Sequence, residues 1–268
     1  MEAAILILFG FALGSTVASF LNVVADRVPA GGSITSPPSR CPVDGHRLKP
    51  YELVPVLSYL VQRGRCRVCA SRIPLRIVVV EVIGGAVFAA IAYWYGATLD
   101  ALLLAVTASF LLVIAIIDLE YKLVLNKVLL VAVPVAVVTS MLWSEAMRTP
   151  AWDFGGRQVS LLTDALVAGV AGAAFLFIPV LLTGGRGMGM GDVKLALAIG
   201  PWVGLLRLPI ALMAAIVIAG LAGIILLALR ISGRKDAIPF APFLCIGTAV
   251  GLIWGESLGE WYWGLLTG

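Results

Sequence analysis

The feature that most constrains this chain is a series of apolar runs that contain few charged side chains. Hydrophobic residues make up 61% of the 268 residues and charged residues 13%, whereas a soluble domain is about half apolar and a quarter charged. A membrane-spanning helix needs about 20 mainly apolar residues. The candidate runs are 3–24, 77–95, 101–118, 127–143, 164–183, 193–206, 208–230 and 239–256. We therefore predict an all-α integral membrane protein with about eight transmembrane helices.

The runs divide the chain into three parts. Residues 1–24 form a first transmembrane helix, which we expect to be retained because it lacks the basic start and the cleavage site of a signal peptide. Residues 25–76 form a long polar loop that contains three of the four cysteines. Residues 77–268 form a polytopic membrane domain.

Basic residues are distributed unevenly between the two ends of the predicted helices. Of the 19 Lys and Arg residues, 16 lie on the side of loop 25–76, and only Arg148, Arg157 and Arg207 lie on the other side. Because positively charged loops tend to stay in the cytoplasm, we expect loop 25–76, and the helix ends on the same side of the membrane, to face the cytoplasm. The positive excess lies in loops that flank the membrane, so topology and anionic lipid account for the net charge of +4. We therefore expect the lipid bilayer as a partner and no nucleic-acid partner.

The loop carries a pattern of zinc ligands. Cys66 and Cys69 are three residues apart, as in a zinc ribbon, and Cys41 begins a similar turn in which the fourth ligand is Asp44 instead of cysteine. A reducing cytosol favours metal binding over a disulfide, and zinc accepts carboxylate oxygen as well as thiolate. We predict a zinc-ribbon-like site formed by Cys41, Asp44, Cys66 and Cys69. Two alternatives are ligation by His46 and a decayed site with free thiols.

Two aspartates stand at the cytoplasmic ends of predicted helices. Asp118 ends the third apolar run, and Asp192 begins the sixth within GMGMGD. Ionisable residues in a membrane indicate functional sites. If the two carboxyls meet, one stays protonated while the other is ionised, and such a pair hydrolyses peptides by acid and base catalysis. We predict that Asp118 and Asp192 are catalytic; the alternative is that each only marks a helix end.

The glycines before Asp192 have a role in this hypothesis. Gly189 and Gly191 lack side chains, so the backbone can bend there and an extended substrate can pass close to the aspartate. We predict that both support Asp192 and contact substrate. Cys245, within an apolar run, is interpreted as a packing residue.

Several segments resemble the bacterial type IV prepilin peptidases, which are membrane aspartic proteases of the G-x-G-D kind. The resemblance lies in GSTVASFLNVVADRVP (14–29), the cysteine loop (39–81), AIIDLEYKLVLN (115–126), GMGMGDVKLALAIG (187–200) and IPFAPFLCIG (238–247). It implies a multi-pass enzyme of the bacterial inner membrane, active at the cytoplasmic face. The enzyme would remove the basic leader from prepilins and pseudopilins. It also implies that Asp118 and Asp192 are catalytic and that S-adenosylmethionine serves methylation of the new N-terminus where that activity is retained.

The resemblance has two departures. Val124 and Leu125 stand where the family commonly has Ile-Pro, and Asp44 stands where a second cysteine is usual. The second departure concerns metal affinity and methylation rather than peptide hydrolysis.

The loop also carries nine basic and three acidic side chains, so it should repel a basic leader. We therefore expect the loop to rest on anionic lipid and leader charges to be read by Asp26 and Glu120. Two other classes of protein are a carboxylate-coupled transporter and a silent assembly protein. The absence of repeated halves disfavours the transporter, and the retained aspartates disfavour the assembly protein. The sequence does not fix the oligomeric state.

Overall fold

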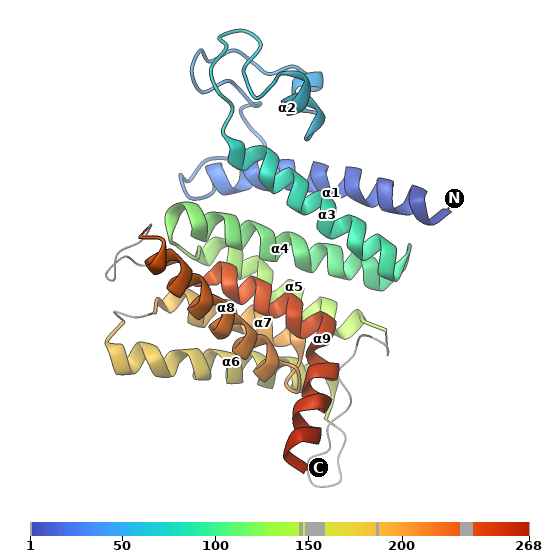
Figure 1. Cartoon of the computed structure of the whole chain (residues 1–268), viewed down its shortest axis with the longest axis vertical. Helices are drawn as coiled ribbons and strands as arrows, with labels where there is room; N and C mark the ends of the chain where they lie inside the picture. The colour runs from blue at the N-terminus through green and yellow to red at the C-terminus, as the bar shows by residue number, and fades with distance from the viewer. Residues whose placement is uncertain (1, 145–146, 148–158, 186–187, 231–237, 268) are drawn as a thin grey trace. The chain divides into compact units, whose positions relative to one another are not determined.

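The computed structural model describes residues 2–144, 147, 159–185, 188–230 and 238–267 (Figure 1). These residues are helical apart from turns and two isolated β-bridges in the cysteine loop, and they contain no β-strand. The long helices are α1 (Glu2–Arg27), α3 (Leu75–Tyr95), α4 (Leu99–Tyr121), α5 (Asn126–Leu142), α6 (Leu161–Thr183), α7 (Met190–Val203), α8 (Leu208–Ala228) and α9 (Ala241–Thr267). The short helices of the loop are η1 (Pro50–Leu53) and α2 (Leu57–Val61). The all-α membrane fold is thereby confirmed.

Each of the eight predicted apolar runs forms a helix, but the count of eight membrane spans is not confirmed. Among the described residues, six helices are long and apolar enough to cross a bilayer: α1, α3, α4, α6, α8 and α9. The helix α5 has 17 residues and α7 has 14. A 14-residue helix covers about 21 Å, which is shorter than the roughly 30 Å hydrocarbon core.

The chain divides into two compact units, with residues 1–116 in unit 1 and residues 117–268 in unit 2. In unit 1, α1 packs against α3, and a Cβ on Gly14 would overlap the carbonyl of Gly84. The absence of side chains at these glycines lets the two helix backbones approach closely. The cysteine loop is held at this pair because the Glu81 carboxylate of α3 accepts a 2.7 Å hydrogen bond from the Val56 N–H.

The centre of unit 2 is the short helix α7. It contacts α5, α6, α8 and α9, and ten of its 14 residues are buried. The indole N–H of Trp202 donates to Thr139 Oγ1 of α5 at 3.2 Å, and Gly200 of α7 lies directly against the backbone of Gly169 in α6. Its neighbours thus enclose α7, which explains how so short a helix keeps a buried aspartate in its first turn.

Candidate functional site

Asp118 lies in the last turn of α4 and is buried, with 5% of its surface exposed. Its Oδ2 accepts a 3.1 Å hydrogen bond from the N–H of Ala241, the first residue of α9. The first N–H groups of a helix have no partner within the helix, so the carboxylate satisfies one of them. This bond fixes the orientation of Asp118 and joins the end of one helix to the beginning of another.

Asp192 is the third residue of α7 and is also buried, at 8% exposure. Its backbone N–H donates to the Gly189 carbonyl at 3.2 Å. The charge of Asp118 acts on Asp192, and the charges of both act on the buried thiol of Cys245. The structure therefore places the two predicted aspartates in one site within unit 2.

Cys245 is a neighbour of this site that the sequence did not reveal. It lies on α9, four residues after Ala241, and is buried at 7% exposure. Cys245 therefore lies about one helical turn beyond the N–H that binds Asp118. The sequence signal that could have found it is this spacing from the start of the last helix.

The two glycines before Asp192 have different surroundings. A Cβ on Gly191 would lie 2.9 Å from the Cβ of Val124, in the segment that follows Asp118. A Cβ on Gly189 would meet no atom closer than 3.8 Å. The space at Gly191 is therefore used by the chain itself, whereas the space at Gly189 remains open.

A second contact joins the segments that carry the aspartates. Lys194 Nζ, two residues after Asp192, donates to Asn126 Oδ1 at 3.0 Å. Asn126 is the first residue of α5, directly after the turn that follows Asp118. Lys194 therefore connects α7 to this turn, a role that the sequence did not indicate.

The two acidic residues expected to read leader charges lie in different units. Asp26 belongs to unit 1 and forms a 2.6 Å ion pair with Arg76. Glu120 belongs to unit 2 and is exposed in the last turn of α4. Arg76 thereby offsets part of the charge of Asp26.

The cysteine loop brings together the four predicted metal ligands. One ligand atom each of Cys41, Asp44, Cys66 and Cys69 lies within 4.8 Å of the others. The Sγ atoms of Cys41 and Cys69 are 3.6 Å apart, and two thiolates bound tetrahedrally to one zinc ion would be about 3.8 Å apart for Zn–S bonds of 2.3 Å. The donor set and its spacing therefore fit a zinc ion.

The two halves of this cluster are built alike. In each half the residue four positions after the first cysteine donates its N–H to that cysteine's carbonyl, from Gly45 to Cys41 at 2.9 Å and from Ala70 to Cys66 at 3.0 Å. Both donors have positive φ, 75° at Gly45 and 57° at Ala70. Each half is thus a tight turn that aims two ligands at one point, which is the geometry of a zinc ribbon.

His46 lies behind Asp44 instead of in the cluster. Its Nδ1 is 2.6 Å from Asp44 Oδ1, and its Nε2 is shielded from solvent with no hydrogen-bond partner among the described residues. The side-chain hydrogen bond to His46 lowers the pKa of Asp44 to about 2. The Asp44 carboxylate therefore lies in the cluster, and His46 lies against it from outside the cluster.

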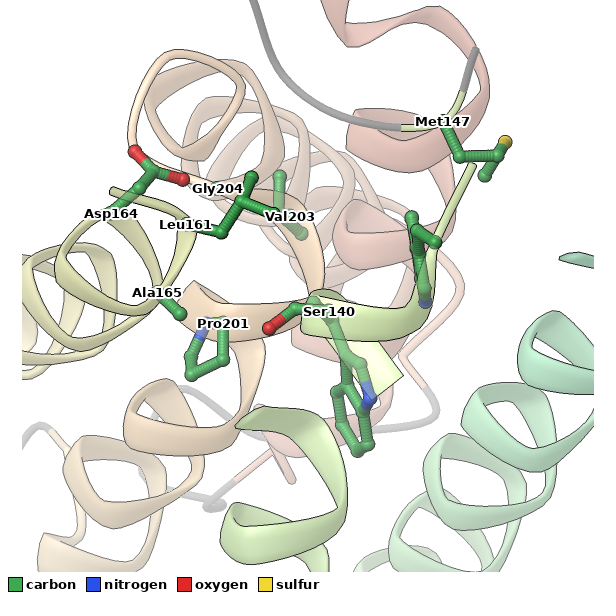
Figure 2. A pocket seen from close by; sticks show the side chains of 10 residues that line it. Ser140, Met147, Leu161, Asp164, Ala165, Pro201, Val203 and Gly204 are labelled. Atoms are coloured by element: carbon green, nitrogen blue, oxygen red, sulfur yellow. The ribbon is translucent and has the colours of Figure 1, made fainter. Parts of the chain in front are cut away.

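A pocket at the other end of α7 is separate from the aspartates. Its lining includes Ser140 of α5, Asp164 of α6, and Pro201 and Val203 of α7 (Figure 2). Pro201 is nine residues beyond Asp192, or about 14 Å along the helix. Asp164 Oδ1 accepts a 3.3 Å hydrogen bond from the Leu205 N–H, so it holds the turn between α7 and α8.

Two protein-family models match this chain, one in its N-terminal region and one in the region that follows. The family model "Bacterial Peptidase A24 N-terminal domain" covers residues 12–95, and the model "Type IV leader peptidase family" covers residues 105–224. No solved structure gave a significant match.

Three curated relatives are each named "Prepilin leader peptidase/N-methyltransferase". The Pseudomonas putida protein is 34% identical, with 96% of this chain and 94% of the relative covered. The Bacillus subtilis protein is 31% identical, with 97% of both chains covered. The Pseudomonas aeruginosa protein is 30% identical, with 93% of this chain and 91% of the relative covered. None of these similarities supports a transporter.

Proposed function

Because the chain belongs to the type IV leader peptidase family, we propose that it is a membrane aspartic endopeptidase that removes the basic leader from type IV prepilins and pseudopilins. The observation that carries the proposal is the pair of buried carboxylates, Asp118 and Asp192, in one site of unit 2. Both lie at or beside helix starts: the first N–H of α9 orients Asp118, and the first turn of α7 bears Asp192. Preorganised acids and bases are what peptide hydrolysis requires.

Two neighbouring carboxyls in a poorly solvated site do not both ionise, so the pair holds one proton. The ionised carboxylate takes a proton from water as the water oxygen bonds to the scissile carbonyl carbon. The protonated carboxyl donates to the carbonyl oxygen. When the C–N bond breaks, the departing amine receives a proton from the pair, and a hydroxyl of the tetrahedral intermediate returns one proton to the pair as the carbonyl re-forms, which restores the starting state.

The hydrogen bond from Ala241 occupies Asp118 Oδ2, which leaves Oδ1 to act on water. The open space at Gly189 lets a substrate backbone approach Asp192. Gly191 supports the aspartate indirectly, because its close contact with Val124 sets the distance between the two catalytic segments.

Leader recognition has a proposed electrostatic component. Asp26 and Glu120 attract the basic leader, while the nine basic residues of loop 25–76 are neutralised by anionic lipid headgroups. The chain is a protein of the bacterial inner membrane. The excess of basic residues on the side of this loop supports an active site that faces the cytoplasm.

Cys41, Asp44, Cys66 and Cys69 would hold zinc, which would stabilise the fold of a loop that has little apolar core. S-adenosylmethionine would supply the methyl group if the chain retains N-methyltransferase activity, as the names of its relatives indicate. The intact mass of a matured substrate tests this second activity. One added methyl group on the new N-terminus supports it, and an unmodified terminus contradicts it.

The test of the peptidase is co-expression of a pilin-like precursor with the wild type, Asp118→Asn or Asp192→Asn. Leader loss with the wild type and intact precursor with both variants is the expected result. Cleavage that survives both substitutions would refute the proposal. Equal amounts of the three proteins in the membrane fraction serve as the control for folding.

A further inference from the structure

The cysteine loop carries an apolar surface that neither the metal cluster nor the peptidase mechanism uses. On the short helix α2, Leu57, Leu60 and Val61 are 60%, 62% and 82% exposed. They are three and four residues apart and therefore share one side of the helix, which we call the α2 apolar face. Tyr59 points elsewhere, into the loop, because a Cβ on Gly64 would stand 2.8 Å from its hydroxyl oxygen.

A hydrogen bond fixes the level of α2 along the membrane-spanning helix α3. The Val56 N–H, directly before α2, donates at 2.7 Å to the carboxylate of Glu81, which is buried at 5% exposure. Helix α3 has 21 residues and is about 30 Å long, so crossing the hydrocarbon core needs its full length. Glu81 is six residues, or about 9 Å, inside the first residue of α3, and helix side chains tilt back toward the N-terminal end. The start of α2 therefore lies at the membrane boundary and not above it.

The backbone at Val56 shows how firmly this position is held. Its φ is 62°, a conformation that a β-branched residue rarely adopts. The Leu57 N–H donates to the Pro55 carbonyl across it at 2.6 Å, which makes a strained γ-turn. Strained backbone persists only where the surrounding structure enforces it. The bond to Glu81 supplies this constraint and ties the strained turn to α3.

The charges around the α2 apolar face match an anionic lipid surface. Arg63, Arg65 and Arg67 follow α2 directly and are exposed. Each acidic side chain of the loop has a partner within the chain, in the pairs Asp26–Arg76, Asp44–His46 and Glu52–Lys49. The exposed charge is therefore basic and would repel a basic leader. Exposed apolar side chains flanked by arginines are typical of a helix that lies in the headgroup region of a bilayer.

We propose that the α2 apolar face inserts into the cytoplasmic leaflet of the bilayer, with the arginines that follow it on anionic headgroups. The inference rests on the proposed function for the cytoplasmic position of the loop, and it names the side chains by which the loop contacts lipid. Insertion at the level where α3 begins holds the basic surface of the loop against the membrane and apart from the leader.

The first test measures contact with acyl chains. A fluorescent amino acid is placed at position 61 of the full-length enzyme, or at position 43 as the control, because Val43 is also an exposed valine of the loop, at 69%, but lies in a zinc turn. Vesicles with about 30% anionic phosphatidylglycerol carry bromine on their acyl chains as the quencher. We expect at least about threefold stronger quenching at position 61 than at position 43. Equal quenching at the two positions, or none at position 61, would overturn the inference.

The second test identifies the occupant and the role of charge. In vesicles of phosphatidylcholine alone, quenching at position 61 should fall at least about twofold, because the arginines lose their anionic partners; an unchanged value contradicts their contact with headgroups. A photoreactive benzophenone side chain at position 61 should crosslink to lipid, whereas crosslinks to precursor or to a second copy of the chain overturn the inference. Leader cleavage is measured in the same vesicles. If cleavage fails while position 61 is quenched, the peptidase proposal alone fails; if the enzyme cleaves and position 61 is not quenched, only this inference fails.

Discussion

The metal cluster and the aspartate pair are assembled in opposite ways. The cluster depends on two short turns, each closed by one local hydrogen bond from Gly45 or Ala70. The aspartate site depends on contacts between residues far apart in the chain, such as Ala241 with Asp118 and Lys194 with Asn126. A locally built site survives changes elsewhere, whereas a site built from helix ends depends on the packing of the whole unit.

The largest effect that this comparison predicts is at the aspartates. Asp118→Asn and Asp192→Asn should each reduce leader cleavage by at least about 1000-fold, and the double variant should lose little more, because the two carboxyls act as a unit. Quantitative cleavage assays on the three variants measure this. Zinc content should stay at the wild-type level in all three, and losses that simply add would contradict a shared proton.

Removal of a metal ligand should lower zinc binding and leave leader cleavage intact, the reverse of the result at the aspartates. Asp44→Ala should lower zinc affinity by more than about 100-fold, and His46→Ala by about tenfold because it removes the support of the ligand instead of the ligand itself. Metal analysis and chelator competition measure both, with leader cleavage as the parallel readout. Unchanged zinc affinity in Asp44→Ala, or a larger loss in His46→Ala, would show that the carboxylate is not the ligand.

The third prediction concerns the contact at Gly191. Gly191→Ala places a Cβ 2.9 Å from that of Val124, so Asp192 should shift and kcat should fall roughly 10- to 100-fold. Val124→Gly should restore much of this loss in the double variant. Gly189→Ala is the matched control for the effect on kcat, because its new Cβ meets no atom closer than 3.8 Å.

If the space at Gly189 serves the substrate, Gly189→Ala should raise KM and should not be rescued by Val124→Gly. Rescue of both alanine variants by the same change would show that the two glycines do not differ as the structure indicates. Steady-state kinetics on the four proteins separates these outcomes.

The smallest expected effect is at the leader carboxylates. Neutralising Asp26 and Glu120 together should weaken cleavage of a basic leader by about three- to fivefold, a range typical of exposed charges. Precursors with a neutralised leader are the control, and equal losses on both substrates would refute the electrostatic role.

The sequence predicted the helices well because their signal is local and repeated. The run 77–95 became Leu75–Tyr95, and 208–230 became Leu208–Ala228. The count of eight spans is not confirmed, because apolarity alone does not identify a span: α7 is apolar and its neighbours in the protein enclose it. Burial in protein and burial in lipid favour the same side chains.

The metal cluster and the aspartate site also differ in how far the sequence could predict them. Spacing alone was enough to predict Asp44 beside the three cysteines, since turn geometry is encoded within a few residues. The hydrogen bond from the Ala241 N–H could not be predicted in this way, because a backbone N–H does not depend on residue type and its partner is 123 residues away. Nor does composition distinguish the crowded Gly191 from the open Gly189, since that difference lies in Val124.

The bond between Ala241 and Asp118 also has a consequence for biosynthesis. A ribosome makes Asp118 long before it makes α9, because 123 residues separate the two partners. Until that last helix inserts, the carboxylate lacks the amide that orients it. The orientation that this bond gives to Asp118 is therefore reached only after the first turn of α9 has been made.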